Sequence, residues 1–145
     1  MTDLTATMRA TTEGFLYAFN GDWQPDATLV YRSEDCEHVF LPASAGTPKK
    51  TKDEWAAYFK NVAPLVKDAK MTINDYLGNP AERRAVCRSS MTATTAAGCF
   101  NNEYVWFLAF DETGKQITRI EESLDSAATR EIRARFREAG LLPKH

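Results

Sequence analysis

The chain has 145 residues, 43% of them hydrophobic and 26% charged, and a formal net charge of −2. This length and composition suit one globular domain with its own core, so we expect a single domain over residues 1–145. The slight negative charge argues against a nucleic-acid partner, because phosphate binding requires a clustered basic surface.

The sequence also lacks the features of several other protein classes. No apolar run approaches the roughly 18 residues that a bilayer span requires, and the amino terminus lacks the apolar centre of a signal peptide. We therefore expect a cytoplasmic protein with no membrane partner. The three cysteines match no metal-ligand spacing and His38 is the only internal histidine, so we expect free thiols and no metal site.

The first half of the chain predicts helices and one short strand. Apolar side chains at helical spacing indicate a helix over 3–20, and a second short helix is expected over about 25–31. Residues 38–41 indicate a short strand that ends before Pro42. A third helix is expected to begin at Thr51, because Thr51 and Glu54 have the spacing of a capping box.

In the second half the apolar pattern changes to a period of two. Strands are expected over about 70–78, 84–97, 100–111 and 116–125, with turn residues between them. The last element is expected to be a helix over about 127–139, which ends at Gly140 and has Asp125 or Ser126 as its cap. A helix cap is the simplest role for Asp125, and a catalytic role is the alternative.

This order of elements predicts an α+β fold. Three helices, an early strand and a long meander fit a curved antiparallel sheet wrapped around the helices, as a cone (an α+β barrel) open at one end. Such a cone offers an apolar pocket for a small-molecule substrate.

Three segments resemble the nuclear-transport-factor-2-like superfamily, the group of SnoaL, ketosteroid isomerase and scytalone dehydratase. They are FLYAFNGD at 15–22, FDETGK at 110–115 and IEESLDS at 120–126. A narrower similarity, to small fungal isomerases of meroterpenoid and related polyketide pathways, rests on RSEDCEH at 32–38, NEYV at 102–105 and IEE at 120–122. The resemblance implies a homodimer that needs no cofactor and acts on a late biosynthetic intermediate.

The chain departs from the catalytic residues of these relatives. Matching the hairpins places the tyrosine, the aspartate base and the buried acid of ketosteroid isomerase at Phe15, Phe40 and Trp106. Steroid isomerisation by the same residues is therefore not expected. Scytalone dehydratase uses two histidines, whereas only one is expected in this interior.

The same matching, combined with alternation along each strand, predicts which side chains face the inside of the cone. Glu122 is expected on the outer face, with Ile120 and Leu124. The inward set is Arg119, Glu121 and Ser123 on the last strand, Tyr104, Trp106 and Leu108 on its neighbour, and Cys36, His38 and Phe40 on the first.

Three of these residues are candidate catalytic groups. His38 can exchange a proton near neutral pH, so it is a candidate general acid or base, or else a buried residue bonded to a carbonyl or to Asp35. Glu121 is the expected second acid/base group, or else part of a structural ion pair with Arg119 or Arg32. Arg32 is a candidate for binding an enolate or carboxylate, or else ties its loop down through Asp35.

The expected substrate-binding residues are mostly aromatic, and an ordinary place in the core is the alternative for Trp55, Phe59, Tyr104 and Trp106. They are Phe40, Trp55, Phe59, Tyr104, Trp106 and Arg119.

This set of residues fits a cofactor-independent isomerase or cyclase. His38 would remove a proton next to a carbonyl, Glu121 would return a proton elsewhere, and Arg32 or Tyr104 would stabilise the oxyanion. A dehydratase of the same fold and a non-catalytic binding protein are the alternatives.

Homodimerisation through the outer face of the sheet is also expected. Met91, Val105 and Phe107 are predicted to lie on this face, and large apolar side chains on an exposed sheet favour pairing.

Overall fold

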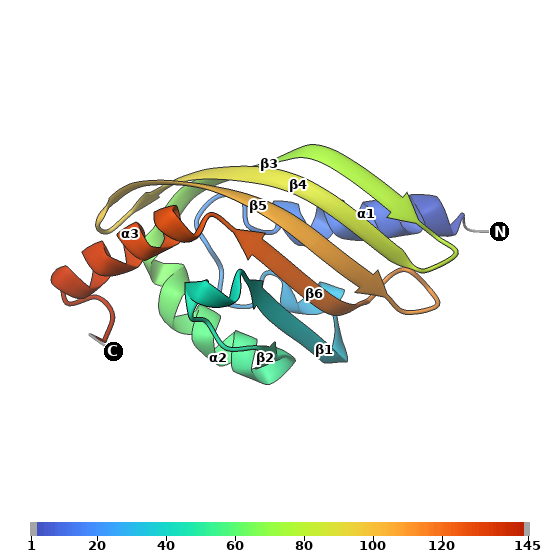
Figure 1. Cartoon of the computed structure of the whole chain (residues 1–145), viewed down its shortest axis with the longest axis horizontal. Helices are drawn as coiled ribbons and strands as arrows, with labels where there is room; N and C mark the ends of the chain where they lie inside the picture. Colours follow the sequence, from blue (N-terminus) through green and yellow to red (C-terminus); the bar gives the residue numbers. More distant parts are fainter. Residues whose placement is uncertain (1–2, 144–145) are drawn as a thin grey trace.

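The computed structural model describes residues 3–143. A curved sheet lies over helices on its concave side, in the strand order β2-β1-β6-β5-β4-β3 (Figure 1). The helices are α1 (Leu4–Tyr17), α2 (Lys52–Val62) and α3 (Ser126–Glu138), and the strands are β1 (Arg32–Leu41), β2 (Lys50–Thr51), β3 (Val66–Asn79), β4 (Arg84–Thr95), β5 (Gly98–Phe110) and β6 (Ile117–Leu124). The predicted α+β cone around three helices is confirmed.

Two helix starts were predicted correctly. The Thr51 hydroxyl accepts a hydrogen bond from the Glu54 amide at 3.2 Å, and the Glu54 carboxylate accepts one from the Thr51 amide at 3.0 Å, so the capping box of α2 is confirmed. Asp125 caps α3 by accepting from the amides of Ala127 and Ala128. Each such cap stabilises its helix by about 1 kcal/mol.

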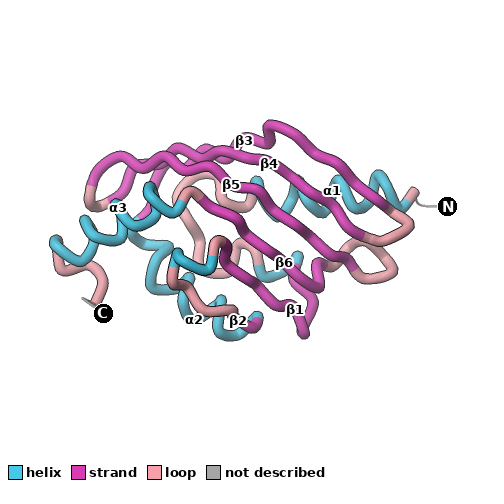
Figure 2. The backbone as a smooth tube through the Cα atoms, in the orientation of Figure 1, coloured by secondary structure: helices cyan, strands magenta, loops and turns pink. Residues whose placement is uncertain are grey.

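Two elements differ from the prediction. The segment at 25–31 is a turn followed by a 3-10 helix at Leu29–Tyr31, not a longer helix. Strand β1 begins at Arg32, well before residue 38, and runs parallel to β6. The sheet is therefore mixed, and its edges β2 and β3 do not pair with each other (Figure 2). A parallel pair is possible here because β1 and β6 are separated by α2 and the whole meander.

The core lies between the concave face of the sheet and the helices α1 and α2. The rings of Phe15 and Trp106 meet edge to face at 5.5 Å, and the Trp106 indole donates to the Ser89 hydroxyl at 2.8 Å. Within residues 3–143, no helix combines the length and the apolar character needed to cross a bilayer.

A bulge near the start of β6 decides which side chains face the concave side. Phe110 pairs with Ile117, but the residue before it in β5, Ala109, pairs with Arg119 and not with Thr118. Strand β6 therefore contains one extra residue at this point. Because side chains alternate along a strand, an extra residue moves every later side chain to the opposite face.

The expectation that Arg119, Glu121 and Ser123 face inward is wrong for this reason. Without the bulge, the pairing would place Glu121 opposite the buried Trp106; with the bulge, Glu122 is opposite Trp106. Directly paired residues share a face, so Glu122 lies inside the cone. The Glu122 side chain is 10% exposed, whereas the Glu121 side chain is 27% exposed.

The outer face of the sheet differs from the predicted one in one residue. Met91 is 1% exposed and lies on the concave side, so its predicted outward position is wrong. Val105 and Phe107 do lie on the outer face, where they are partly exposed and pair with Ser123 and Glu121. The predicted dimer therefore rests on a smaller apolar patch than the sequence suggested.

Candidate functional site

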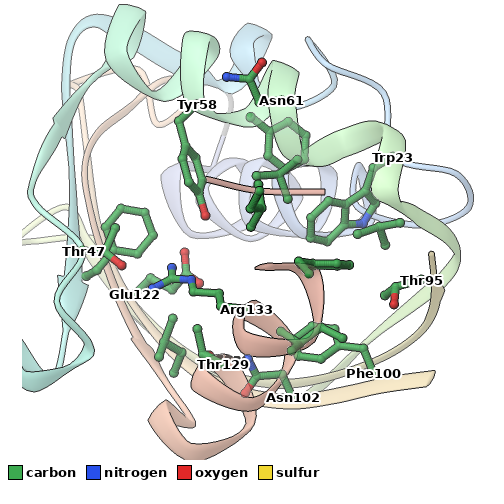
Figure 3. A pocket seen from close by; sticks show the side chains of 18 of the residues that line it. Trp23, Thr47, Tyr58, Asn61, Thr95, Phe100, Asn102, Glu122, Thr129 and Arg133 are labelled. Atoms are coloured by element: carbon green, nitrogen blue, oxygen red, sulfur yellow. Dashed lines mark hydrogen bonds between the residues drawn. The ribbon is translucent and has the colours of Figure 1, made fainter. Parts of the chain in front are cut away.

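A cavity of about 800 Å³ opens between the concave face of the sheet, α2 and α3 (Figure 3). Its volume and its apolar wall suit an organic molecule of several rings. The wall includes five of the residues expected to bind substrate and all three tryptophans of the chain: Phe40, Trp55, Phe59, Tyr104 and Trp106, together with Trp23.

A row of three polar side chains runs from the core to this wall. Arg32 Nη1 lies 3.0 Å from His38 Nδ1, and His38 Nε2 lies 2.8 Å from Glu122 Oε1. Arg32 and His38 are each 1% exposed, and Glu122 is the member of the row that lines the cavity. The row places one carboxylate in contact with a ligand and keeps its two partners in the protein interior.

The contact with Arg32 determines the tautomer of His38. A guanidinium has only N–H donors, so Nδ1 of His38 must accept the hydrogen bond. The proton of a neutral imidazole is then on Nε2, from which it is donated to Glu122. Both nitrogens of His38 are occupied, and Arg32 Nη2, which has no hydrogen-bond partner within residues 3–143, is buried away from the cavity. Glu122 Oε2 is therefore the atom of the row left for a ligand, and it makes no hydrogen bond to any residue between 3 and 143.

Aromatic stacking holds the imidazole in place. The His38 ring centroid lies 4.4 Å from that of Phe40 and 4.6 Å from that of Trp55, and the ring is nearly parallel to both. The Arg32 guanidinium also packs on this cluster, with its Cζ 4.4 Å from the centroid of the Trp55 ring. Such packing leaves His38 little freedom to rotate away from Glu122.

Burial controls the charge of the first two members of the row. Burial lowers the pKa of His38, an effect that Glu122 opposes and Arg32 reinforces. Burial also lowers the pKa of Arg32, to about 10, which still leaves the guanidinium protonated at neutral pH. His38 is therefore a neutral imidazole that positions Glu122, between a cation and an acid.

Two tyrosines add hydrogen-bond donors to the cavity wall. Burial raises the pKa of Tyr58, although the nearby Arg133 lowers it, and burial together with Glu122 holds the pKa of Tyr104 well above its usual value. Both hydroxyls therefore stay protonated. Figure 3 shows the Tyr58 hydroxyl directed toward the side of the cavity where Glu122 and Arg133 lie.

The fold is found in several solved structures. The BvnE pinacolase from Penicillium brevicompactum has a TM-score of 0.87 and 23% sequence identity, over 95% of this chain and 99% of that protein. PrhC from Penicillium brasilianum has a TM-score of 0.87 and 19% identity, over 96% of this chain and 93% of that protein. A Shewanella denitrificans protein named as a SnoaL-like polyketide cyclase has a TM-score of 0.70 and 11% identity, over 88% of this chain and 97% of that protein.

Relatives by sequence decide the family. No family model matches the chain. The monooxygenase AacuP of Aspergillus aculeatus is 35% identical over 120 residues, which are 83% of this chain and 82% of that protein. The chain belongs to the same family as the monooxygenase AacuP. Monooxygenase nsrQ of Aspergillus novofumigatus, 32% identical over 85% of this chain and 81% of its own length, is another relative.

The two outward-facing site candidates, Arg119 and Glu121, form a surface cluster. Arg119 Nε lies 3.1 Å from Glu121 Oε1, and Arg119 Nη1 lies 3.7 Å from Glu37 Oε2. The Arg119 side chain is 44% exposed. Neither Arg119 nor Glu121 is placed to contact a ligand in the cavity.

Sequence reasoning missed Glu122, Tyr58 and Arg133 as cavity residues. The adjacent pair Glu121-Glu122 contained the right residue type, but only the bulge distinguishes the two positions. Tyr58 lies one turn before Val62 in α2 and next to the buried Phe59, and so offered a weak signal. Among residues 3–143, no group of three His, Cys, Asp or Glu side chains has an arrangement that could hold a metal ion.

Proposed function

We propose that the protein is a cofactor-independent isomerase or cyclase that moves a proton on a polyketide- or terpenoid-derived intermediate of fungal secondary metabolism. The observation that supports this most strongly is the Arg32–His38–Glu122 row, which presents a single carboxylate to an aromatic cavity. A positioned carboxylate beside an aromatic wall is suited to general acid/base catalysis.

The proposed reaction replaces the proton that it removes. Glu122 Oε2 takes a proton from a carbon next to a carbonyl of the substrate, and the electrons of the C–H bond move into an enolate. The Tyr104 hydroxyl donates a hydrogen bond to the enolate oxygen. The protonated Glu122 exchanges its proton with solvent and then delivers a proton to another carbon of the conjugated enolate, so substrate and product have the same composition. His38 and Arg32 act as positioning residues.

Names of relatives support the general setting. The relatives with sequence similarity are fungal, and one from Claviceps purpurea, 26% identical over 75% of this chain, is named an ergochrome gene cluster protein. The structural neighbours include a protein named a pinacolase and one named as a polyketide cyclase. A dehydratase would use the same proton removal, followed by loss of hydroxide from the neighbouring carbon as water.

The names of AacuP and nsrQ favour a second candidate, an oxygenase. Deprotonation of the substrate by Glu122 would form a carbanion that is electron-rich enough to react with O₂. A CH₂ group and O₂ would then give a carbonyl and water, with the substrate supplying all the electrons. The first step, and the role of Glu122, are the same in both candidates.

The test is an assay of the purified protein without added cofactor, with and without O₂, in D₂O. The substrate is a multi-ring phenolic ketone with a C–H group next to the carbonyl. The proposal expects turnover without O₂ and a product of unchanged composition that contains deuterium at a carbon. Turnover that requires O₂ would support the oxygenase, and binding without any turnover under either condition would contradict both.

A further inference from the structure

The wall of the cavity has more positive than negative side chains. Among the lining residues that the structure describes, Lys50, Arg133 and Arg137 are cations and Glu122 is the one carboxylate. The whole chain, in contrast, has a formal net charge of −2. The excess of positive charge is therefore a local property of this cavity.

Arg133 is the cation best placed to meet a ligand. It lies on α3 on the cavity side, and its contact with the protein is a long one, from Nη1 to the Ala45 carbonyl oxygen at 3.5 Å. Within residues 3–143 it forms no ion pair. On the same helix, Arg135 lies outside the cavity and is paired with Glu131.

Tyr58 lies next to Arg133 and completes a donor pair. Its hydroxyl points toward Arg133 in Figure 3, and its ring lies 4.8 Å from the Lys50 ammonium. A guanidinium and a hydroxyl that converge from α3 and α2 present several N–H and O–H donors to one position. Oxygen anions are the ligands that such donors bind most strongly.

We infer that the cavity binds a ligand with an acidic oxygen, a carboxylate or an ionised phenol or enol, which is held by Arg133 and the Tyr58 hydroxyl beside Glu122. This inference rests on the proposed function for the identity of the ligand as a substrate. The acidic oxygen orients the rings along the aromatic wall, and the reacting carbon is brought to Glu122. A neutral analogue of the same shape would leave the donors of Arg133 unpaired, so it binds more weakly.

Matched ligands test this directly. Anthraquinone-2-carboxylic acid is compared with its methyl ester, and 2-hydroxyanthraquinone, at a pH where it is ionised, with 2-methoxyanthraquinone. All three tryptophans line the cavity, so quenching of tryptophan fluorescence reports binding. The acidic member of at least one pair is expected to bind about 10- to 100-fold more tightly, the range of a charge-assisted hydrogen bond. The pair that shows the preference indicates whether the acidic oxygen of the ligand is a carboxylate or an ionised phenol.

Three variants test which side chains cause the tighter binding of the acid. Arg133→Met and Tyr58→Phe are each expected to weaken binding of the acid about tenfold or more and to leave binding of its neutral partner within about twofold. Arg135→Met changes the net charge by the same amount on the same helix, outside the cavity, and is expected to leave both affinities unchanged. This control separates a local contact from a general effect of charge.

The inference is overturned if neither acid binds more tightly than its partner, or if Arg135→Met weakens the acid as much as Arg133→Met does. Glu122→Gln separates this outcome from failure of the proposed function. If this variant keeps full turnover while the preference for the acid persists, the proposed function fails and the inference stands. If it loses turnover and no preference exists, only the inference fails.

Discussion

Replacing Arg32 with methionine is expected to raise the pKa of His38 and to allow Nδ1 to take up a proton. In the wild type, the guanidinium occupies Nδ1 and lowers the pKa of the imidazole. Methionine retains much of the aliphatic volume but has no N–H donor and no charge. The imidazole can then form an ion pair with Glu122, which already accepts a hydrogen bond from Nε2.

The size of the change follows from the distance between the two groups. Arg32 Nη1 lies 3.0 Å from His38 Nδ1, and two unit charges about 4 Å apart interact by about 4 kcal/mol at an effective dielectric constant of about 20. Burial opposes the charged imidazole in both proteins and so cancels in the comparison, and loss of the Arg32 charge leaves the pKa of His38 higher in the variant.

Nitrogen NMR of the histidine rings measures this change. The chain has two histidines, so labelled imidazole gives a simple spectrum. In the wild type near neutral pH, His38 is expected to show a protonated Nε2 and an unprotonated Nδ1. Arg119→Met, which removes a cation from the outer face, is the control and should leave the titration of His38 unchanged. A protonated Nδ1 in the wild type, or the same pKa in wild type and Arg32→Met, would refute the reasoning.

Two further predictions concern pH and assembly. Burial lowers the pKa of His38 in the folded protein. Below about pH 6.5 the unfolded chain therefore binds a proton at His38 that the folded protein does not bind. The free energy of unfolding then falls by up to about 1.4 kcal/mol for each unit that the pH is lowered. Urea unfolding between about pH 7 and pH 5 should show this loss in the wild type and less of it in His38→Gln, whereas parallel curves would contradict it. The apolar outer-face residues Val105 and Phe107 predict a dimer at micromolar concentration that Phe107→Glu dissociates, and a wild-type monomer in sedimentation would contradict it.

Local signals in the sequence predicted the elements well. The capping box at Thr51 and the cap at Asp125 involve residues two or three positions apart, so no tertiary information is needed to recognise them. The alternation of apolar residues in the second half likewise placed the four long strands. The length of β1 was underestimated because residues 32–37 are mostly polar and join the sheet through pairing with distant residues of β6.

The site was predicted in part, and one extra residue accounts for the rest. His38 and the aromatic side chains of β1 and β5 face the concave side, as alternation along these strands predicted, whereas Arg32 was expected in a loop and lies at the start of β1. The facing of Glu121 and Glu122 depends on the bulge in β6, which no residue pattern in 116–124 reveals. The row itself joins residues 84 positions apart and follows only from the parallel pairing of β1 with β6.

Comparing Glu122→Gln with Glu121→Gln tests the central claim, that Glu122 exchanges the proton with the ligand. The two substitutions are chemically identical and adjacent in sequence, but one side chain lines the cavity and the other lies on the outer face. Turnover of a common substrate is expected to fall about 10²- to 10⁴-fold in Glu122→Gln and to stay within about twofold of wild type in Glu121→Gln, with similar melting temperatures in both. Full activity in Glu122→Gln, or the larger loss in Glu121→Gln, would contradict the account.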